Sequence, residues 1–147
     1  MTNQTTSDIV IDASPSQIMS VIADFDSYPE WATGVKQCDV VEPGPDGRAT
    51  KVAFVLDASP IRDSYTLAYT WAEDHVEWAI DEPGSMLKAM DGAYVVEELP
   101  DGSARVTYRL AVEVGIPLLG MLRRKAEKVI IDTALKGLKK RVESTSS

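Results

Sequence analysis

The chain carries few residues whose types and spacing fit catalysis. Its single histidine, His75, follows Asp74 in a predicted turn, and one histidine without matching ligands does not form a metal site. Its single cysteine, Cys38, falls in a predicted strand, so neither an internal disulfide nor a cysteine metal cluster can form. No Ser/His/Asp order, phosphate-binding glycine loop or dinucleotide fingerprint is present. The sequence therefore predicts no catalytic residue, no metal site and no cofactor.

Seven charged residues fall in or next to predicted strands, where a carboxylate or an arginine that faces a cavity could act as an acid or a base. No two of them have the spacing that is typical of a catalytic pair. We expect these side chains on the solvated outer face of a sheet. They are Arg62, Asp63, Lys88, Asp91, Arg105, Arg109 and Glu113.

Length and composition predict one domain that spans residues 1–147, with flexible tails at 1–7 and 144–147. The formal net charge is −8, which for the chain as a whole argues against nucleic acid or an anionic membrane surface as a partner. The polar start of the chain lacks the basic and apolar regions of a signal peptide, and no apolar stretch has the length of a membrane span. We expect a cytoplasmic protein that is a monomer or a weak homodimer.

Hydrophobic spacing and turn residues predict the order of the elements. After a first strand at 8–13, Ser14 is a good helix N-cap, with Pro15 at the first helical position and Gln17 placed for a capping box. A short second helical turn is expected at 26–31. Six further strands follow, separated by turn signals. Their expected ranges are 35–42, 50–56, 63–71, 76–80, 86–98 and 103–114.

Alternation of apolar and polar residues in several strands is typical of a sheet with one buried face. Gly92 is expected to mark a bulge, which leaves the facing of residues 86–96 open. One long helix is expected from Leu118 to about Glu143, with two apolar stripes that contact different partners. The first stripe is Leu119, Leu122, Ala126, Val129, Ile130 and Thr133, and the second is Ile131, Leu135, Leu138 and Val142.

The long helix is also basic. Residues 119–143 carry eight basic and three acidic side chains, a net charge of +5 that leaves −13 for the rest of the chain. One interpretation is a solvated face that is balanced by the acidic body, with favourable basic residues near the helix C-terminus. The other is transient contact with an anionic membrane, to load or unload a ligand.

Four stretches in this order of elements resemble the START-like (SRPBCC) superfamily, and within it the small bacterial polyketide cyclase/dehydrase and lipid-transport type. They are "DFDSYPEW", "MLKAMDGAYVV", "SARVTYRLAVEV" and "IPLLGMLRRKAEKVIIDTALKGLKKRVE". The resemblance covers about residues 9–143. It implies an α+β helix-grip fold, in which a curved seven-stranded antiparallel sheet surrounds a long C-terminal helix, with two short helices after the first strand. It also implies a deep apolar cavity beneath that helix.

The resemblance and the predicted faces together give a set of residues that are expected to line the cavity, since apolar pockets are built largely from aromatic and apolar side chains. Plain core packing is the alternative interpretation for each, and the two are compatible. Small residues of the long helix, such as Ala134 and Gly137, either allow close packing or leave volume for a ligand. The candidates are Tyr28, Trp31, Phe54, Tyr65, Tyr69, Trp78, Met90, Tyr94, Tyr108, Leu119, Leu122, Ala126, Ile130 and Thr133.

Two functions fit these expectations, because members of the superfamily bind lipids, polyketides, sterols, quinones or plant hormones and only some are catalysts. The first is carriage or sensing of a hydrophobic small molecule, such as a lipid, a polyketide or an isoprenoid-like compound, without catalysis. The second is a polyketide cyclase or dehydratase, in which a tyrosine or an arginine supports enolate chemistry on a bound chain. The lack of a catalytic constellation favours the first.

Overall fold

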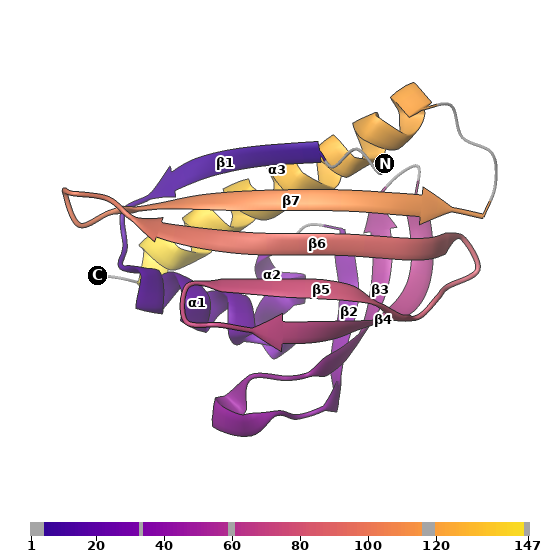
Figure 1. The fold of residues 1–147 in the computed structure, drawn as a ribbon, viewed down its shortest axis with the longest axis horizontal. Coiled ribbons are helices and arrows are strands. Elements are labelled where there is room, and N and C mark those ends of the chain that lie inside the picture. The colour runs from indigo at the N-terminus through magenta and orange to yellow at the C-terminus, as the bar shows by residue number, and fades with distance from the viewer. Residues whose placement is uncertain (1–4, 33, 59–60, 116–119, 146–147) are drawn as a thin grey trace.

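The computed structural model describes residues 5–32, 34–58, 61–115 and 120–145 (Figure 1). One strand and three short helical segments open the chain. They are β1 (Thr5–Ile11), α1 (Pro15–Ala23), the 3₁₀ turn η1 (Phe25–Ser27) and α2 (Tyr28–Trp31). Six strands follow, with a second 3₁₀ turn, and one long helix comes last. They are β2 (Val35–Glu42), η2 (Pro45–Gly47), β3 (Lys51–Ala58), β4 (Ile61–Trp71), β5 (His75–Glu82), β6 (Leu87–Glu98), β7 (Ala104–Val114) and α3 (Gly120–Thr145).

The strands form one antiparallel sheet in the order β1-β7-β6-β5-β4-β3-β2. Figure 1 shows α3 behind β1 and β7, with α1 and α2 on the same side of the sheet. Helix α3 contacts β1, β7, α1 and α2, and it also reaches β3 at the far part of the curved sheet. The expected α+β helix-grip fold, with seven strands and two short helices after the first, is confirmed.

The start of α1 follows its predicted capping pattern. The backbone N–H of Gln17 donates to Ser14 Oγ at 3.3 Å, and Ser14 N–H donates to Gln17 Oε1 at 3.1 Å. Pro15 takes the first helical position, where no backbone donor is needed. The helix then buries Ile18, Met19 and Ile22 against the sheet side of the molecule.

Only one of the two expected stripes of α3 is fully buried. Ile131, Leu135, Leu138 and Val142 are at most 2% exposed and pack into the core, as the second stripe predicts. The first stripe is different: Ala126 is buried, Ile130 and Thr133 are half-buried, and Val129 is 41% exposed. The expectation that both stripes are covered was therefore wrong for Val129.

Most element boundaries differ from the expected ones by one to three residues, and those of β1 and α3 bear on the expected tails. Strand β1 begins at Thr5, and Ser7 pairs with Tyr108 of β7, so part of the expected tail at 1–7 belongs to the sheet. Helix α3 continues to Thr145, two residues beyond the expected end. The bulge expected at Gly92 was also wrong, because the pairing of β6 with β7 runs through Gly92 without a shift and is irregular only between Leu87 and Ala89.

Glu127 fixes α3 to the edge of the sheet. Its carboxylate is 1% exposed and accepts hydrogen bonds from Thr5 Oγ1 at 2.6 Å and from the backbone N–H of Val112 at 2.8 Å. Among the described residues, β1 pairs with Ala104 to Leu110 of β7, and Val112 lies outside this range. Glu127 thus supplies the partner that a buried backbone donor needs.

Asp63 connects β4 to the turn that precedes β6. Its carboxylate accepts from the backbone N–H groups of Leu87 at 2.6 Å, Met86 at 2.9 Å and Ser85 at 3.0 Å. Partial burial acts to raise the pKa of this carboxyl, but the backbone hydrogen bonds outweigh it and hold the pKa below its ordinary value. Asp63 therefore stabilises this turn as an anion, a structural role beyond the solvated one expected for it.

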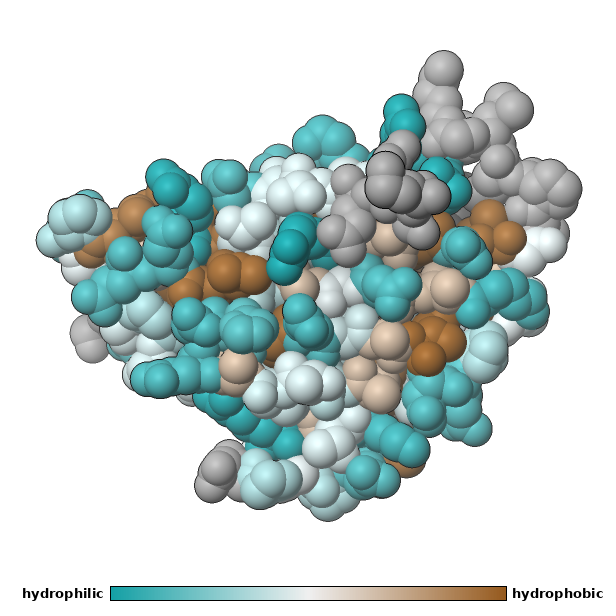
Figure 2. Space-filling model, in the orientation of Figure 1, coloured by the Kyte–Doolittle hydropathy of each residue, from teal (hydrophilic) through white to brown (hydrophobic). Residues whose placement is uncertain are grey.

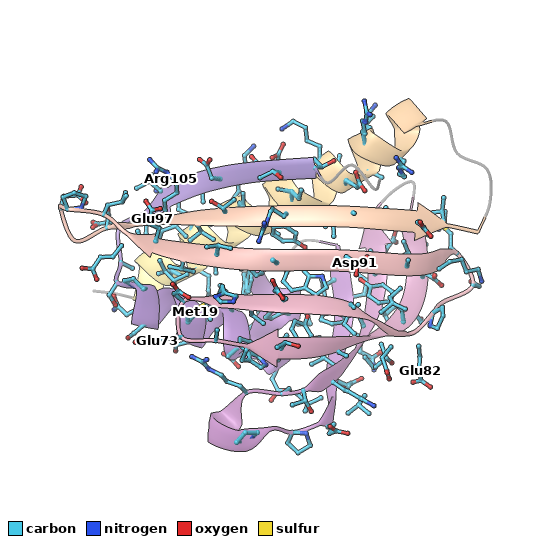
Figure 3. The ribbon with its side chains drawn as sticks, in the orientation of Figure 1. Met19, Glu73, Glu82, Asp91, Glu97 and Arg105 are labelled. Carbon is cyan, nitrogen blue, oxygen red and sulfur yellow. The ribbon has the colours of Figure 1, made fainter. Side chains whose placement is uncertain are left out.

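The outer face of the sheet is largely hydrophilic, with hydrophobic residues only in small separate patches (Figure 2). Asp91, Glu97 and Arg105 lie on this face, away from α3 (Figure 3). Arg105 and Glu97 are cross-strand partners at 3.7 Å. Lys88, Arg62 and Glu113 are exposed and Arg109 is half-buried, which confirms a solvated face for most of the charged strand residues. No helix in the described part of the chain combines the length and the apolar character of a membrane span.

Candidate functional site

A cavity lies between the concave face of the sheet and the helices α2 and α3. The space open to the centres of water molecules is about 70 Å³, within about 610 Å³ of atom-free space that includes a part open to solvent. Strands β2 to β7 and both helices contribute side chains. The lining consists of Tyr28, Ala32, Val35, Phe54, Leu56, Tyr65, Leu67, Tyr69, Trp78, Met90, Tyr94, Tyr108, Ile130 and Ala134.

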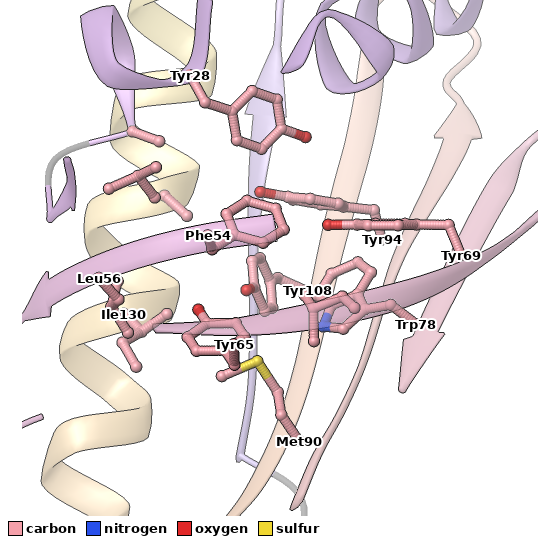
Figure 4. A pocket seen from close by; sticks show the side chains of 14 residues that line it. Tyr28, Phe54, Leu56, Tyr65, Tyr69, Trp78, Met90, Tyr94, Tyr108 and Ile130 are labelled. Atoms are coloured by element: carbon pink, nitrogen blue, oxygen red, sulfur yellow. The ribbon is translucent and has the colours of Figure 1, made fainter. Parts of the chain in front are cut away.

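All five tyrosines of the chain line this cavity (Figure 4). Strand alternation accounts for four of them, because Tyr65 and Tyr69 share one face of β4, and Tyr94 of β6 is the cross-strand partner of Tyr108 of β7. The rings of Tyr94 and Tyr108 are 4.6 Å apart between centroids, in an edge-to-face arrangement. Tyr28 comes from α2 on the opposite side. The cavity is therefore aromatic on several sides and carries hydroxyl groups.

The tyrosine hydroxyls differ in their partners. Tyr28 donates a short hydrogen bond to the backbone carbonyl oxygen of Ile22, which fixes its ring. Among the described residues, no hydrogen-bond partner is found for the hydroxyls of Tyr65, Tyr69, Tyr94 and Tyr108. Buried polar groups usually have partners. These four hydroxyls are thus available to a polar group that enters the cavity.

Burial keeps these tyrosines neutral. Desolvation is the main cause that raises the pKa of Tyr69, Tyr94 and Tyr108 above the ordinary tyrosine value, and nearby tyrosines and Cys38 add to the effect at Tyr69. Desolvation is also the main cause that raises the pKa of Tyr65. At neutral pH each hydroxyl therefore carries its proton and can donate as well as accept a hydrogen bond.

Trp78 supplies one more polar group. It is 6% exposed, and its indole nitrogen Nε1 is buried without a hydrogen-bond partner. Gly92, its cross-strand partner, has no side chain, so the indole ring lies directly over the backbone of β6. This close approach explains the glycine that the sequence pattern assigned to a bulge.

The lining offers hydrogen bonds rather than charge. None of the described residues that line the cavity is ionised at neutral pH. The nearby Cys38 is also buried. Burial first, and then the carboxylates of Asp39 and Asp26, raise the pKa of its thiol from 9.0 to about 12. Such a thiol is a poor nucleophile, because the thiolate is the reactive form. The arrangement can therefore bind and orient an apolar molecule that carries a polar group.

The structure brings together nine of the fourteen predicted cavity residues. Trp31 and Thr133 instead border a groove on the outer side of α2 and α3, and Ala126 is buried outside the cavity lining. Leu119 lies outside the described residues, and the side chain of Leu122 is not described either. The nine are Tyr28, Phe54, Tyr65, Tyr69, Trp78, Met90, Tyr94, Tyr108 and Ile130.

Trp31 is displaced from the cavity by its contact with α3. A β-carbon on Gly137 would lie 2.1 Å from the backbone oxygen of Trp31 and 3.4 Å from its ring, so α2 and α3 meet at this glycine. Gly137 therefore allows close packing, one of the two explanations considered for it. The cavity side of the same contact is formed by Ala32 and Ala134.

Five lining residues were missed as candidates. Leu67 shares the face of Tyr65 and Tyr69, and Leu56 shares that of Phe54, so strand alternation could have found both. Ala134 was noted as a small residue but was not chosen over Thr133. Ala32 and Val35 flank the segment between α2 and β2, and no sequence pattern identifies them.

Comparison with known proteins agrees with this architecture. A START superfamily protein from Mycobacterium smegmatis has 22% identity and a TM-score of 0.89, over 97% of this chain and 99% of that chain. The Zhui aromatase/cyclase from Streptomyces sp. R1128 has 11% identity and a TM-score of 0.82, over 100% and 97% of the two chains. TTHA0849 from Thermus thermophilus has 23% identity and a TM-score of 0.80, over 99% and 100%. No curated protein matches the sequence.

At these identities the solved structures show the fold alone. The family is shown by the sequence itself, because a family model described as polyketide cyclase/dehydrase and lipid transport matches residues 2–143. This match spans nearly the whole chain and includes every described residue that lines the cavity. The chain thus belongs to the polyketide cyclase/dehydrase and lipid transport family, and it has the START-like fold.

Proposed function

We propose that this protein binds a hydrophobic small molecule in the cavity beneath α3 and carries or senses it without changing it. The ligand would be a lipid, a polyketide or an isoprenoid-like compound. One observation carries the proposal: the cavity holds all five tyrosines, and four of their hydroxyls have no partner among the described residues. Burial of apolar ligand surface would supply the affinity, at roughly 25 cal/mol per Å², and the hydroxyls would orient the polar end.

Entry of a ligand requires the lining to expand. The space for water centres, about 70 Å³, suits a few water molecules rather than a drug-sized ligand. Val35, Ile130 and Ala134 are only half-buried, and they lie where β2 and α3 border the cavity. We propose that the ligand enters between these two elements.

A matched pair of substitutions tests the proposal. Ala134→Phe adds a ring within the lining, whereas Ala79→Phe adds the same ring on the exposed outer face of β5. Binding of the neutral hydrocarbon fluorene is measured by equilibrium dialysis. We expect the affinity to fall at least about tenfold for Ala134→Phe, because the added ring fills the site, and to stay unchanged for Ala79→Phe. Equal binding by both variants, or no binding by the wild type, would contradict the proposal.

The alternative is a polyketide cyclase or dehydratase that acts on a bound chain. The family and the free hydroxyls support it, since positioned donors can stabilise an enolate. The raised pKa values of the tyrosines weigh against it, because a neutral hydroxyl is a weak base at neutral pH. Incubation with a linear poly-β-ketone distinguishes the two: ring formation faster than in buffer would favour the enzyme.

Transient membrane contact through α3 is a further part of the proposal. Lys136 and Lys140 are exposed and border the same outer groove as Trp31, where they could contact anionic head groups. Other basic residues of α3 are paired instead, such as Lys128 with Asp132 at 3.2 Å. Co-sedimentation with vesicles tests this: we expect binding to anionic but not to zwitterionic vesicles, with loss at high salt.

A further inference from the structure

The indole N–H of Trp78 is a fully buried donor in the cavity lining, and it has no hydrogen-bond partner among the described residues. Trp78 is 6% exposed, and its Nε1 atom is buried without a hydrogen bond. Among the described residues, Trp31 Nε1 and Arg123 Nε share this condition, but neither residue lines the cavity. In Figure 4 the nitrogen edge of Trp78 points toward the interior between Tyr65, Tyr108 and Met90.

A buried donor without an acceptor destabilises the empty protein. The fold nevertheless holds the indole in place on three sides. Its ring rests on Gly92, and its centroid lies 5.4 Å from those of Tyr94 and Tyr108. An indole N–H can only donate. A partner for it must therefore bring an acceptor atom into the cavity.

The rest of the lining limits what that partner can be. Tyr65, Tyr94 and Tyr108 also line the cavity, and their hydroxyls are uncharged at neutral pH, because burial raises the pKa of each further above an ordinary value that is already 10.0. None of the described lining residues carries a charge. A ligand with a carboxylate, a phosphate or an ammonium group would have to leave water without a counter-charge, which costs far more than leaving a neutral oxygen unpaired.

We propose that the cavity selects neutral apolar molecules that carry an accepting oxygen, such as a ketone, quinone or ester, and that Trp78 is the donor that fixes this oxygen. This inference rests on the proposed binding function and narrows its ligand class. It makes Trp78 a specificity-determining residue. The neighbouring tyrosine hydroxyls add further donors around the same oxygen or around a second one.

Three probes that share one ring system separate the contributions: fluorene, which has no oxygen, 9-fluorenone, which has one carbonyl, and 9-fluorenone-2-carboxylate, which adds a charged group and is compared with its neutral methyl ester. Their affinities are measured by equilibrium dialysis for the wild type, Trp78→Phe and Trp31→Phe. Trp31→Phe is the matched control, because it also removes an unpartnered indole N–H but lies outside the cavity lining. The ratio of the affinity for fluorenone to the affinity for fluorene is compared between variants, because a change in cavity volume alters both affinities alike and leaves their ratio unchanged.

We expect this ratio to fall about tenfold for Trp78→Phe, as loss of a hydrogen bond to an otherwise unpaired donor implies, and to stay at the wild-type value for Trp31→Phe. The carboxylate is expected to bind more than about a hundredfold more weakly than its methyl ester. If Trp78→Phe does not fold, β-(3-benzothienyl)alanine in place of Trp78 keeps the ring shape without the N–H donor.

An unchanged ratio in the Trp78 variant, or a carboxylate that binds as tightly as its methyl ester, would overturn the inference while leaving hydrophobic binding intact. Failure of the wild type to bind any of the three probes would overturn the proposed function as well. The two failures are therefore distinguishable.

Discussion

Gly92 lies directly beneath the indole of Trp78. A β-carbon placed on Gly92 would come within 2.4 Å of the ring carbons Cε2 and Cζ2, a distance that real side chains do not tolerate. The two residues are cross-strand partners in β5 and β6. The position of the indole in the cavity thus depends on the absence of a side chain at residue 92.

Gly92→Ala is therefore expected to move the Trp78 ring into the cavity. The added methyl group overlaps a rigid aromatic ring, so we expect the free energy of unfolding to fall by about 1–3 kcal/mol and the affinity for fluorene to fall as well. Urea unfolding and equilibrium dialysis measure the two effects. Gly115→Ala is the control, because the three nearest atoms that its β-carbon would meet among the described residues all belong to the flexible side chain of Lys88. Equal effects of both substitutions would contradict this account.

Gly137→Ala is expected to destabilise the protein, although alanine is normally preferred in a helix by about 1 kcal/mol. The new β-carbon would lie 2.1 Å from the backbone oxygen of Trp31, so α2 must move away from α3. We expect a loss of about 1–3 kcal/mol in urea unfolding. Lys136→Ala, an exposed neighbour on α3, is expected to change stability by less than about 0.5 kcal/mol. A stabilised Gly137→Ala variant would show that the two helices do not meet at this glycine.

Asp63→Asn is expected to weaken the protein in a pH-dependent way. The folded-state pKa of Asp63 lies below its ordinary value of 3.8, so its contribution is present above that value and is lost as pH falls through the folded-state pKa. Near neutral pH we expect a loss of about 1 kcal/mol, from weaker hydrogen bonds to the turn. The difference from the wild type should shrink in acid.

Thermal unfolding at several pH values measures this difference. Asp57→Asn is the control, because Asp57 forms an exposed ion pair with Arg62 at 2.9 Å, and such pairs contribute little. A loss that persists unchanged in strong acid would mean that the charge of Asp63 does not stabilise the turn.

The five tyrosines are expected to titrate together with unfolding. Their folded-state pKa values are raised above the ordinary value of 10.0, mainly by burial, so their contribution to stability is complete below that value and is lost as pH rises through the folded-state pKa. Phenolate absorbance should stay low in the folded protein just above pH 10 and rise steeply with loss of the circular dichroism signal. In denaturing urea the rise should be gradual and centred near pH 10. A gradual rise without urea would indicate exposed tyrosines.

Strand periodicity predicted which face of several strands is buried, and the resemblance predicted a cavity on that side. Tyr65, Tyr69 and Trp78 were expected on buried faces, and all three line the site. The choice of aromatic residues over aliphatic ones on the same face left out Leu67, although alternation treats both kinds alike. The fold itself came from the resemblance, because periodicity alone predicts a one-sided sheet and an amphipathic helix without an enclosed space.

The helices could not be placed as well from the sequence. Thr133 and Ala134 are adjacent on α3, yet Ala134 lines the cavity and Thr133 borders the outer groove. The boundary between the cavity and the outer groove is set by the contact of α2 with α3, and this contact depends on Gly137 and on the backbone of Trp31. Such a contact between distant segments leaves no periodic signal. The hydrogen bonds of Glu127 to Thr5 and Val112 were missed for the same reason.

Native mass spectrometry of the freshly purified protein shows whether the cavity beneath α3 holds a hydrophobic molecule. We expect a non-covalent adduct of a neutral organic molecule, which is absent from the denatured mass and reduced in Ala134→Phe but not in Ala79→Phe. Where the endogenous ligand has been lost, the bare protein should take up fluorene with the same dependence on the two variants. The mass of the bare chain alone, before and after incubation with fluorene, would contradict the claim that the cavity beneath α3 binds hydrophobic molecules.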